Sequence, residues 1–71
     1  MLVEQLGAAI KERRNSLKIT QPHLADMAGI SVNTLYKIER GKANPTIQVL
    51  DKLLEVLGLQ IDIETRQIPS L

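Results

Sequence analysis

The sequence predicts an all-α domain of four helices, followed by a single β-strand near its C-terminal end. Over residues 2–57, apolar side chains recur at helical spacing in four segments, which glycine, proline and capping residues divide. After residue 58 the pattern changes to strict alternation, which is typical of a strand. A chain of 71 residues with no cysteine and one histidine has room for one domain but cannot stabilise it with a disulfide or a metal cage, so we expect it to oligomerise.

The first predicted helix covers residues 2–17, and a short second helix follows Thr20 and stops at Gly29. The Thr20 hydroxyl can cap the second helix, and Pro22 is harmless in its first turn. Gly7 lies inside the first helix at a cost of ~1 kcal/mol and has no explanation at the level of sequence. The residues expected to face the core are Val3, Leu6, Ile10 and Leu17 in the first helix and Leu24, Ala25 and Ala28 in the second.

The third predicted helix begins after Ser31, whose hydroxyl can cap it, and runs to about residue 40, before Gly41. Leu35 and Ile38 are expected to face the core. The second and third helices are therefore short and are joined by a tight turn at Gly29. This arrangement predicts a helix-turn-helix unit, whose second helix enters the major groove of DNA.

The fourth predicted helix, residues 47–57, follows a turn with Pro45 and a new cap at Thr46. Five of its apolar residues span an arc of roughly 120°, enough for one core-facing side; they are Ile47, Leu50, Leu53, Leu54 and Leu57. Val49 and Val56 widen the apolar arc to about 180°. We therefore expect this helix to be covered on a second side by another subunit.

The last predicted element is a strand over residues 59–65, where Leu59, Ile61, Ile63 and Thr65 alternate with polar residues. A lone strand cannot satisfy its own backbone groups, so we expect it to pair with its copy across a dimer. The expected dimer interface is Val49, Val56, Leu59, Ile61 and Ile63. The expected boundaries are 1–58 for the helix-turn-helix DNA-binding domain, 59–66 for the dimerisation strand and 67–71 for a flexible tail.

Charge is divided unevenly along the chain. Residues 11–42 hold seven basic and three acidic side chains, whereas residues 43–71 hold two basic and four acidic ones. This asymmetry favours one face for a polyanion and another for a different contact. The N-terminus lacks a basic stretch followed by an apolar run, and no apolar stretch approaches the ~20 residues that span a bilayer. We therefore expect a cytoplasmic protein without a membrane partner.

Several motifs resemble the Xre family of Cro/cI-type repressors, with their spacing kept. They are Gln21, Leu24-Ala25, Gly29-Ile30-Ser31, Thr34-Leu35, Lys37-Ile38-Glu39-Arg40-Gly41-Lys42 and Asn44-Pro45-Thr46. The resemblance covers about residues 6–57. It implies a lambda-repressor-like four-helix domain that binds a palindromic double-stranded DNA operator as a homodimer.

The resemblance also implies which side chains touch DNA. Base contacts are expected from the start and outer face of the third helix, at Ser31, Val32, Asn33 and Lys37. Phosphate contacts, which position the protein without reading sequence, are expected at Gln21, Tyr36, Arg40, Lys42, Asn44 and Thr46. The alternative for Val32 is an isolated surface hydrophobe, and for Tyr36 it is local packing. Each phosphate residue taken singly can also be a solvated surface residue.

Arg14 and Glu39 match a partly buried, structural salt bridge of the same family, which would hold the first helix against the third. His23 is a departure, because relatives often carry an acid there that completes a capping box. His23 and Asp26 lie one turn apart, but no nucleophile or third ligand stands beside them. We therefore expect a surface histidine and no metal or other cofactor.

Three classes of function remain: a transcriptional repressor, the antitoxin of a toxin–antitoxin pair, and an enzyme. The sequence has no convergent catalytic group, which argues against an enzyme. Members of the family typically continue after residue 58 with another helix, whereas a strand there is similar to HipB-type antitoxins, whose partner is a HipA-like serine/threonine kinase toxin. We therefore expect the antitoxin of a HipBA-like system that represses its own operon, with a stand-alone Xre-family regulator as the alternative.

Overall fold

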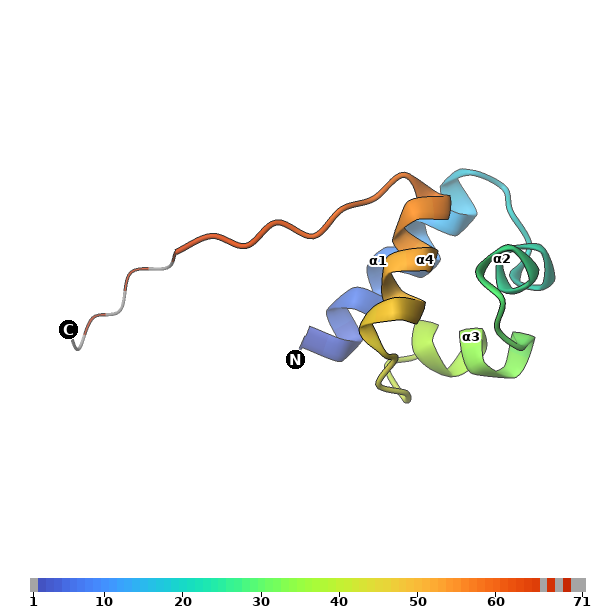
Figure 1. The fold of residues 1–71 in the computed structure, drawn as a ribbon, viewed down its shortest axis with the longest axis horizontal. Coiled ribbons are helices and arrows are strands. Elements are labelled where there is room, and N and C mark those ends of the chain that lie inside the picture. The colour runs from blue at the N-terminus through green and yellow to red at the C-terminus, as the bar shows by residue number, and fades with distance from the viewer. Residues whose placement is uncertain (1, 66, 68, 70–71) are drawn as a thin grey trace.

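The computed structural model describes residues 2–65, 67 and 69, and its regular elements there are four α-helices. These are α1 (Leu2–Ser16), α2 (Gln21–Ala28), α3 (Val32–Glu39) and α4 (Ile47–Leu57). Figure 1 shows them gathered into one body, in which α1 contacts α3 and α4, and α2 contacts the same two helices. The prediction of an all-α four-helix domain is therefore confirmed.

Side-chain caps begin three of the four helices where the sequence predicts them. The hydroxyl oxygens of Thr20, Ser31 and Thr46 accept hydrogen bonds from the backbone N–H three residues later, at 3.2, 3.0 and 3.2 Å. Each bond satisfies a backbone donor that has no partner inside its helix. Gly29 and Gly58 are the C-cap residues that follow α2 and α4, so the turn between α2 and α3 is as short as predicted.

The core lies between all four helices and consists mostly of the residues predicted from helical spacing. The buried apolar residues are Ile10, Leu24, Ala25, Ala28, Leu35, Ile38, Leu50, Leu53, Leu54 and Leu57. Two predicted core residues are wrong, since Ile47 is 77% exposed and Leu17 is 40% exposed. Ile47 is the first residue of α4, and helical side chains point toward the N-terminal end, so this one projects past the helix. Leu17 follows the last residue of α1 and has left the helical face.

The first helix crosses the C-terminal end of α3 at very close range, which explains Gly7. A Cβ atom at Gly7 would collide with the carbonyl oxygen of Ile38 and lie 3.1 Å from that of Glu39. At Gly41, where φ is +71°, a Cβ atom would lie 2.9 Å from Cγ of Glu4. Both glycines thus let α1 approach the backbone of α3 and of the turn after it. This contact positions the helix that is predicted to read DNA.

The predicted strand over residues 59–65 is not formed in the single chain. Within the described residues no strand is present, and the segment is extended and leaves the helical body (Figure 1). A strand needs a neighbouring strand for its backbone groups, and the helical body offers none. Leu59 is half-buried against the core, whereas Ile61 is 52% exposed and Ile63 is 95% exposed.

The predicted C-terminal units extend beyond the described residues, and part of the predicted dimer interface is covered by the chain itself. Of the predicted strand unit 59–66 and tail 67–71, residues 66, 68, 70 and 71 lie outside the described residues. Val49 and Val56, predicted to face a second subunit, are half-buried against the chain's own core. Their exposed parts alone remain for a partner.

Candidate nucleic-acid interface

The α3 helix has a buried side and an exposed side. Leu35, Ile38 and Glu39 are buried, and Leu35 has no exposed surface. On the other side Val32 is 42% exposed, and Asn33 and Lys37 are exposed as well. At 100° per residue these three lie within an arc of about 140°. The structure therefore brings three of the four predicted base-reading residues together on one outer surface.

Ser31, the fourth predicted base-reading residue, is exposed but already engaged. Its hydroxyl oxygen accepts from the Thr34 backbone N–H, and its hydroxyl donates to Oγ1 of Thr34 at 2.8 Å. The hydrogen of Ser31 is thus used within the protein, and only its oxygen can serve a base as it stands. Thr34 is exposed beside it and was not among the residues predicted to contact DNA. Its position three residues after a capping serine was the available signal.

The predicted phosphate residues lie around the C-terminal end of α3. Arg40, Lys42, Asn44 and Thr46 are exposed in the segment that links α3 to α4. The guanidinium carbon of Arg40 lies 5.3 Å from the centre of the Tyr36 ring, which is the geometry of a cation–π contact. Tyr36 therefore packs locally while remaining 46% exposed. The Thr46 hydroxyl caps α4, so this group has a structural role beside any contact with DNA.

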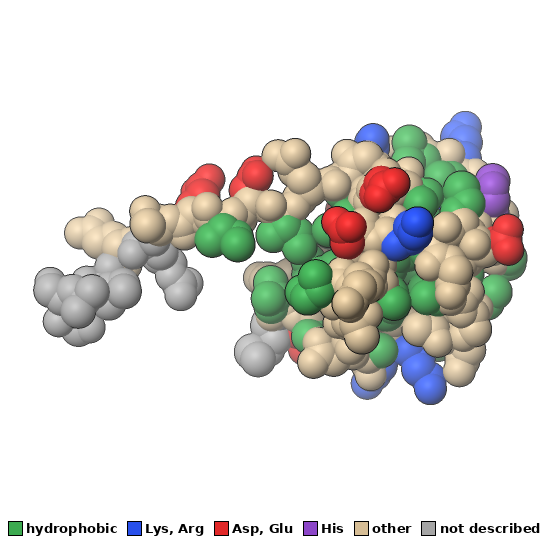
Figure 2. All heavy atoms as spheres, in the orientation of Figure 1, with side chains coloured by type: hydrophobic (Ala, Val, Ile, Leu, Met, Phe, Trp, Pro, Cys, Tyr) green, Lys and Arg blue, Asp and Glu red, His purple; other side chains and the backbone are tan. Residues whose placement is uncertain are grey.

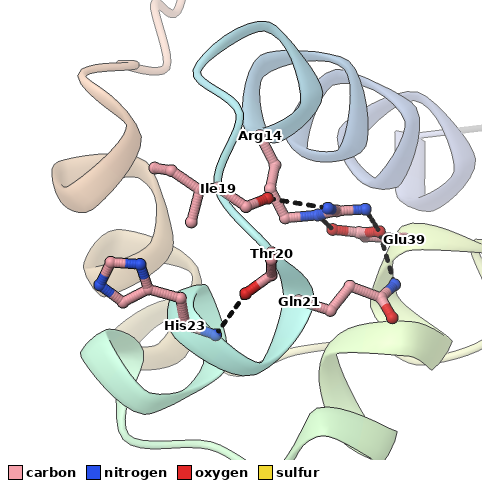
Figure 3. Close-up of polar contacts among 6 residues, drawn as sticks. All are labelled: Arg14, Ile19, Thr20, Gln21, His23 and Glu39. Carbon is pink, nitrogen blue, oxygen red and sulfur yellow. Dashed lines mark hydrogen bonds and ion pairs between the residues drawn. The ribbon is translucent and has the colours of Figure 1, made fainter.

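Glu39, at the C-terminal end of α3, is the centre of a buried polar network (Figure 3). Its Oε2 accepts from Nε of Arg14 at 2.6 Å, and its Oε1 accepts from Nη2 of Arg14 at 3.0 Å. The remaining Arg14 nitrogen, Nη1, donates to the carbonyl oxygen of Ile19 at 3.0 Å. The salt bridge between α1 and α3 is therefore present and two-pronged. Its hydrogen bond and charge raise the pKa of Arg14 above the ordinary value, although burial opposes this.

Gln21 joins this network, which sequence reasoning did not anticipate. Its Nε2 donates to Oε1 of Glu39 at 2.9 Å, and its side chain is half-buried at the N-terminus of α2. A side chain assigned only to phosphate thus also binds the buried carboxylate. The two residues are 18 positions apart, so no local spacing could have shown the contact.

Basic charge on the surface is lower than the count along the chain suggests. Arg14 is buried in its ion pair, and Nε of Arg13 donates to the carbonyl oxygen of Leu57 at 2.9 Å, at the end of α4. The five exposed basic residues of this region are Lys11, Lys18, Lys37, Arg40 and Lys42. Figure 2 shows acidic side chains along the extended C-terminal segment and, beside a basic one, over α4, while other basic side chains lie at the upper and lower edges of the body, the lower edge being that of α3. The uneven distribution of charge between residues 11–42 and the later part of the chain therefore persists on the folded surface.

The described residues contain no group of three or more His, Cys, Asp or Glu side chains that could hold a metal ion. His23 is exposed, and the hydrogen bond that involves it comes from its backbone N–H. No helix in the described part of the chain is long and apolar enough to cross a membrane.

The helix-turn-helix family model matches residues 10–63 of this chain. A putative HTH-type transcriptional regulatory protein of Methanococcus maripaludis is 38% identical over 55 residues, which are 78% of this chain and 17% of that protein. The immunity repressor protein of Bacillus phage phi105 is 38% identical over 56 residues, which are 79% of this chain and 39% of the repressor. This chain thus spans well under half of these two relatives.

A solved structure and a further sequence relative agree with these matches. The clp gene regulator ClgR from Corynebacterium glutamicum has a TM-score of 0.81 at 30% identity, covering 86% of this chain and 78% of that one. A helix-turn-helix transcriptional regulator derived from the SPbeta prophage of Bacillus subtilis, YonR, is 38% identical over 79% of this chain and 52% of its own length. The chain therefore belongs to the Xre/Cro-cI-type helix-turn-helix family of transcriptional regulators, which are DNA-binding proteins and not enzymes.

Proposed function

We propose that this protein is a transcriptional repressor that inserts α3 into the major groove of a specific double-stranded DNA site. The observation that carries the proposal is the outer surface of α3, which exposes Val32, Asn33 and Lys37 while its other side is fixed to α1. A major-groove reader needs such a rigid helix with unengaged polar side chains on its outer side.

Each of the three side chains suits a different base. Asparagine can bond adenine through two atoms, lysine can donate to guanine, and a valine methyl can contact the methyl group of thymine. Ser31 is the fourth base-reading residue, and its oxygen can accept from a base while the hydroxyl hydrogen stays on Thr34.

Phosphate contacts would come from the start of α2 and from the C-terminal end of α3 with the loop that follows it. Gln21 lies at the N-terminus of α2, where free backbone N–H groups and the helix dipole favour an anion. Tyr36 and Arg40 form one unit, and Lys42, Asn44 and Thr46 follow in the loop. Contacts of this kind position the protein, and the charged ones make binding depend on salt.

A homodimer on a palindromic site completes the proposal. The extended residues 59–65 leave Ile61 and Ile63 exposed, and an apolar groove lies beside them, lined by Leu2, Val3, Leu6, Pro45, Ile47 and Ile61. A strand pair between two copies through Leu59, Ile61 and Ile63 would give the backbone groups of this segment their partners. Together with the exposed parts of Val49 and Val56, it would also cover this apolar surface. A two-fold dimer would read half-sites about 34–36 Å apart.

The test begins with selection of binding sites from a random double-stranded DNA library by the purified protein. We expect a two-fold symmetric motif whose binding weakens steeply as salt rises. On the selected duplex, Lys37→Ala should cost ~1–3 kcal/mol and relax the preference at one base pair of each half-site. The matched control is Lys52→Ala, because Lys52 is exposed on α4, away from α3. No enrichment by the wild-type protein, or an unchanged base preference in Lys37→Ala, would contradict the assignment.

A finer function, the antitoxin of a HipBA-like pair with a HipA-like serine/threonine kinase as partner, is a second candidate. It rests on the extended residues 59–65, which carry Asp62 and Glu64 beside exposed isoleucines and could serve a partner protein. Co-expression with a kinase-like protein encoded by the neighbouring gene tests it. A stable complex favours the antitoxin, whereas a protein that purifies alone and has no such neighbour favours the stand-alone regulator.

A further inference from the structure

The hydrogen bond between Gln21 and Glu39 fixes which way the Gln21 amide faces. A carboxylate can only accept hydrogen bonds, so the amide nitrogen must be turned toward Glu39 and the amide oxygen away from it. Figure 3 shows this orientation, with the nitrogen on the dashed line to Glu39. The amide nitrogen has two hydrogens, and the bond to Glu39 uses one of them.

A DNA phosphate is also only an acceptor. The same Gln21 nitrogen can therefore bridge the buried carboxylate and a phosphate, giving one hydrogen to each. Few other side chains could do this from position 21. Glutamate would place a second carboxylate against Glu39. Asparagine is one methylene shorter, so its amide nitrogen would not reach the carboxylate that glutamine bonds at 2.9 Å. Lysine would bring a full charge to a carboxylate that Arg14 already neutralises.

From this geometry we infer that Glu39 is a positioning residue for DNA binding, which orients the Gln21 amide toward a backbone phosphate. The inference rests on the proposed function and extends it, because the buried ion pair then acts on affinity as well as on stability. Arg14 holds the carboxylate from α1 and also binds the Ile19 carbonyl, two residues before Gln21. The network thus ties the end of the DNA-reading helix to the start of α2.

The first test uses the unmodified protein without DNA. Nitrogen-15 relaxation of side-chain amides reports how ordered each glutamine is on the picosecond-to-nanosecond timescale. Gln5 and Gln48 are matched controls, because both are exposed helical glutamines. We expect an order parameter for Gln21 near the ~0.85 of rigid groups, and values below about 0.6 for the two controls. Equal values for all three would overturn the inference.

The second test is a double-mutant cycle on DNA affinity, with the selected duplex as probe. Gln21→Ala is made in the wild-type protein and in a background that carries both Arg14→Met and Glu39→Leu. Apolar pairs of similar volume are often tolerated in place of a buried ion pair, and circular dichroism checks that this background folds. If it does not fold, the order parameters decide alone.

We expect Gln21→Ala to raise the Kd about tenfold in the wild-type protein and less than about twofold in the apolar background. The slope of log Kd against log salt should not change with Gln21→Ala, because a neutral side chain releases no counterion. Equal fold-changes in the two backgrounds would show that Glu39 does not act through Gln21, while wild-type binding still supports the proposed function. A wild-type protein that binds no duplex would overturn both.

Discussion

The C-terminal end of α3 and the extended residues 60–65 both carry groups that need a partner, but only the first finds it within the chain. Glu39 is 6% exposed, and its two oxygens accept from Arg14 and Gln21. Ile63 is 95% exposed, and among the described residues no backbone hydrogen bond joins residues 60–65 to the helical body.

The difference comes from how helices and strands satisfy their backbones. A helix pairs its own N–H and C=O groups, so a chain segment with the right spacing and caps can form one without a neighbour. A strand needs a second strand at its edge. The reading unit can therefore be complete in one chain, whereas the segment after residue 58 depends on a second molecule.

The largest effect is expected when the ion pair at the C-terminal end of α3 is broken. Glu39→Ala leaves the Arg14 guanidinium buried without its carboxylate and should lower the free energy of unfolding by about 3–5 kcal/mol. In a domain this small that loss should remove the cooperative thermal transition. The control is Glu55→Ala on the exposed side of α4, which should change stability by less than ~0.5 kcal/mol. Similar melting curves for the two variants would show that the ion pair does not hold α1 on α3.

Gly7→Ala should also destabilise the fold, because the new methyl group overpacks the contact between α1 and the C-terminal end of α3. The new methyl group would meet the carbonyl oxygens of Ile38 and Glu39, at a cost of roughly 1–3 kcal/mol. Alanine is otherwise favoured over glycine inside a helix by about 1 kcal/mol, so the two effects oppose each other. Urea denaturation should show a net loss for Gly7→Ala. A net gain would mean that α1 can move away from α3 easily.

The helical body could be predicted from sequence because its signals are local. The caps at Thr20, Ser31 and Thr46 and the spacing of the buried leucines specify each helix by itself. The reason for Gly7 could not be found, because the carbonyl it approaches is 31 residues away in the chain, at Ile38. The bond from Gln21 to Glu39 was missed for the same reason.

The outer surface of α3 was more predictable than the use of each group on it. Helical spacing is enough to place Val32, Asn33 and Lys37 opposite Leu35 and Ile38. It does not show that the Ser31 hydroxyl donates to Thr34 or that Arg40 lies over Tyr36, because both depend on side-chain rotation. The alternating pattern of residues 59–65 indicates a segment that can form a strand, but it does not show whether a second strand is there to pair with it.

Lys18→Gly should raise the free energy of unfolding, a smaller change and of opposite sign to those of Glu39→Ala and Gly7→Ala. Lys18 has φ of 58° in the turn after α1, a conformation that costs L-residues about 1–2 kcal/mol. Glycine removes this cost but gains flexibility in the unfolded chain, so the net rise in the free energy of unfolding should stay below about 1 kcal/mol. Lys11→Gly, inside α1, is the control and should lose about 1 kcal/mol. If both variants were destabilised alike, the turn at Lys18 would carry no strain.

The smallest effect on the isolated fold is expected for Ile63→Ser, which removes the most exposed apolar side chain of the unpartnered segment. At protein concentrations too low for association, the free energy of unfolding should change by less than ~0.5 kcal/mol, as for other surface substitutions. Sedimentation equilibrium at higher concentration should show weaker dimerisation, because the substitution removes apolar area from the proposed interface. Glu64→Ser is the matched control, since neighbouring side chains of a strand point to opposite faces. Weaker dimers with Ile63→Ser alone would mean that one face of the segment is buried between two copies; equal dimerisation in both variants and the wild type would leave the second subunit on some other surface.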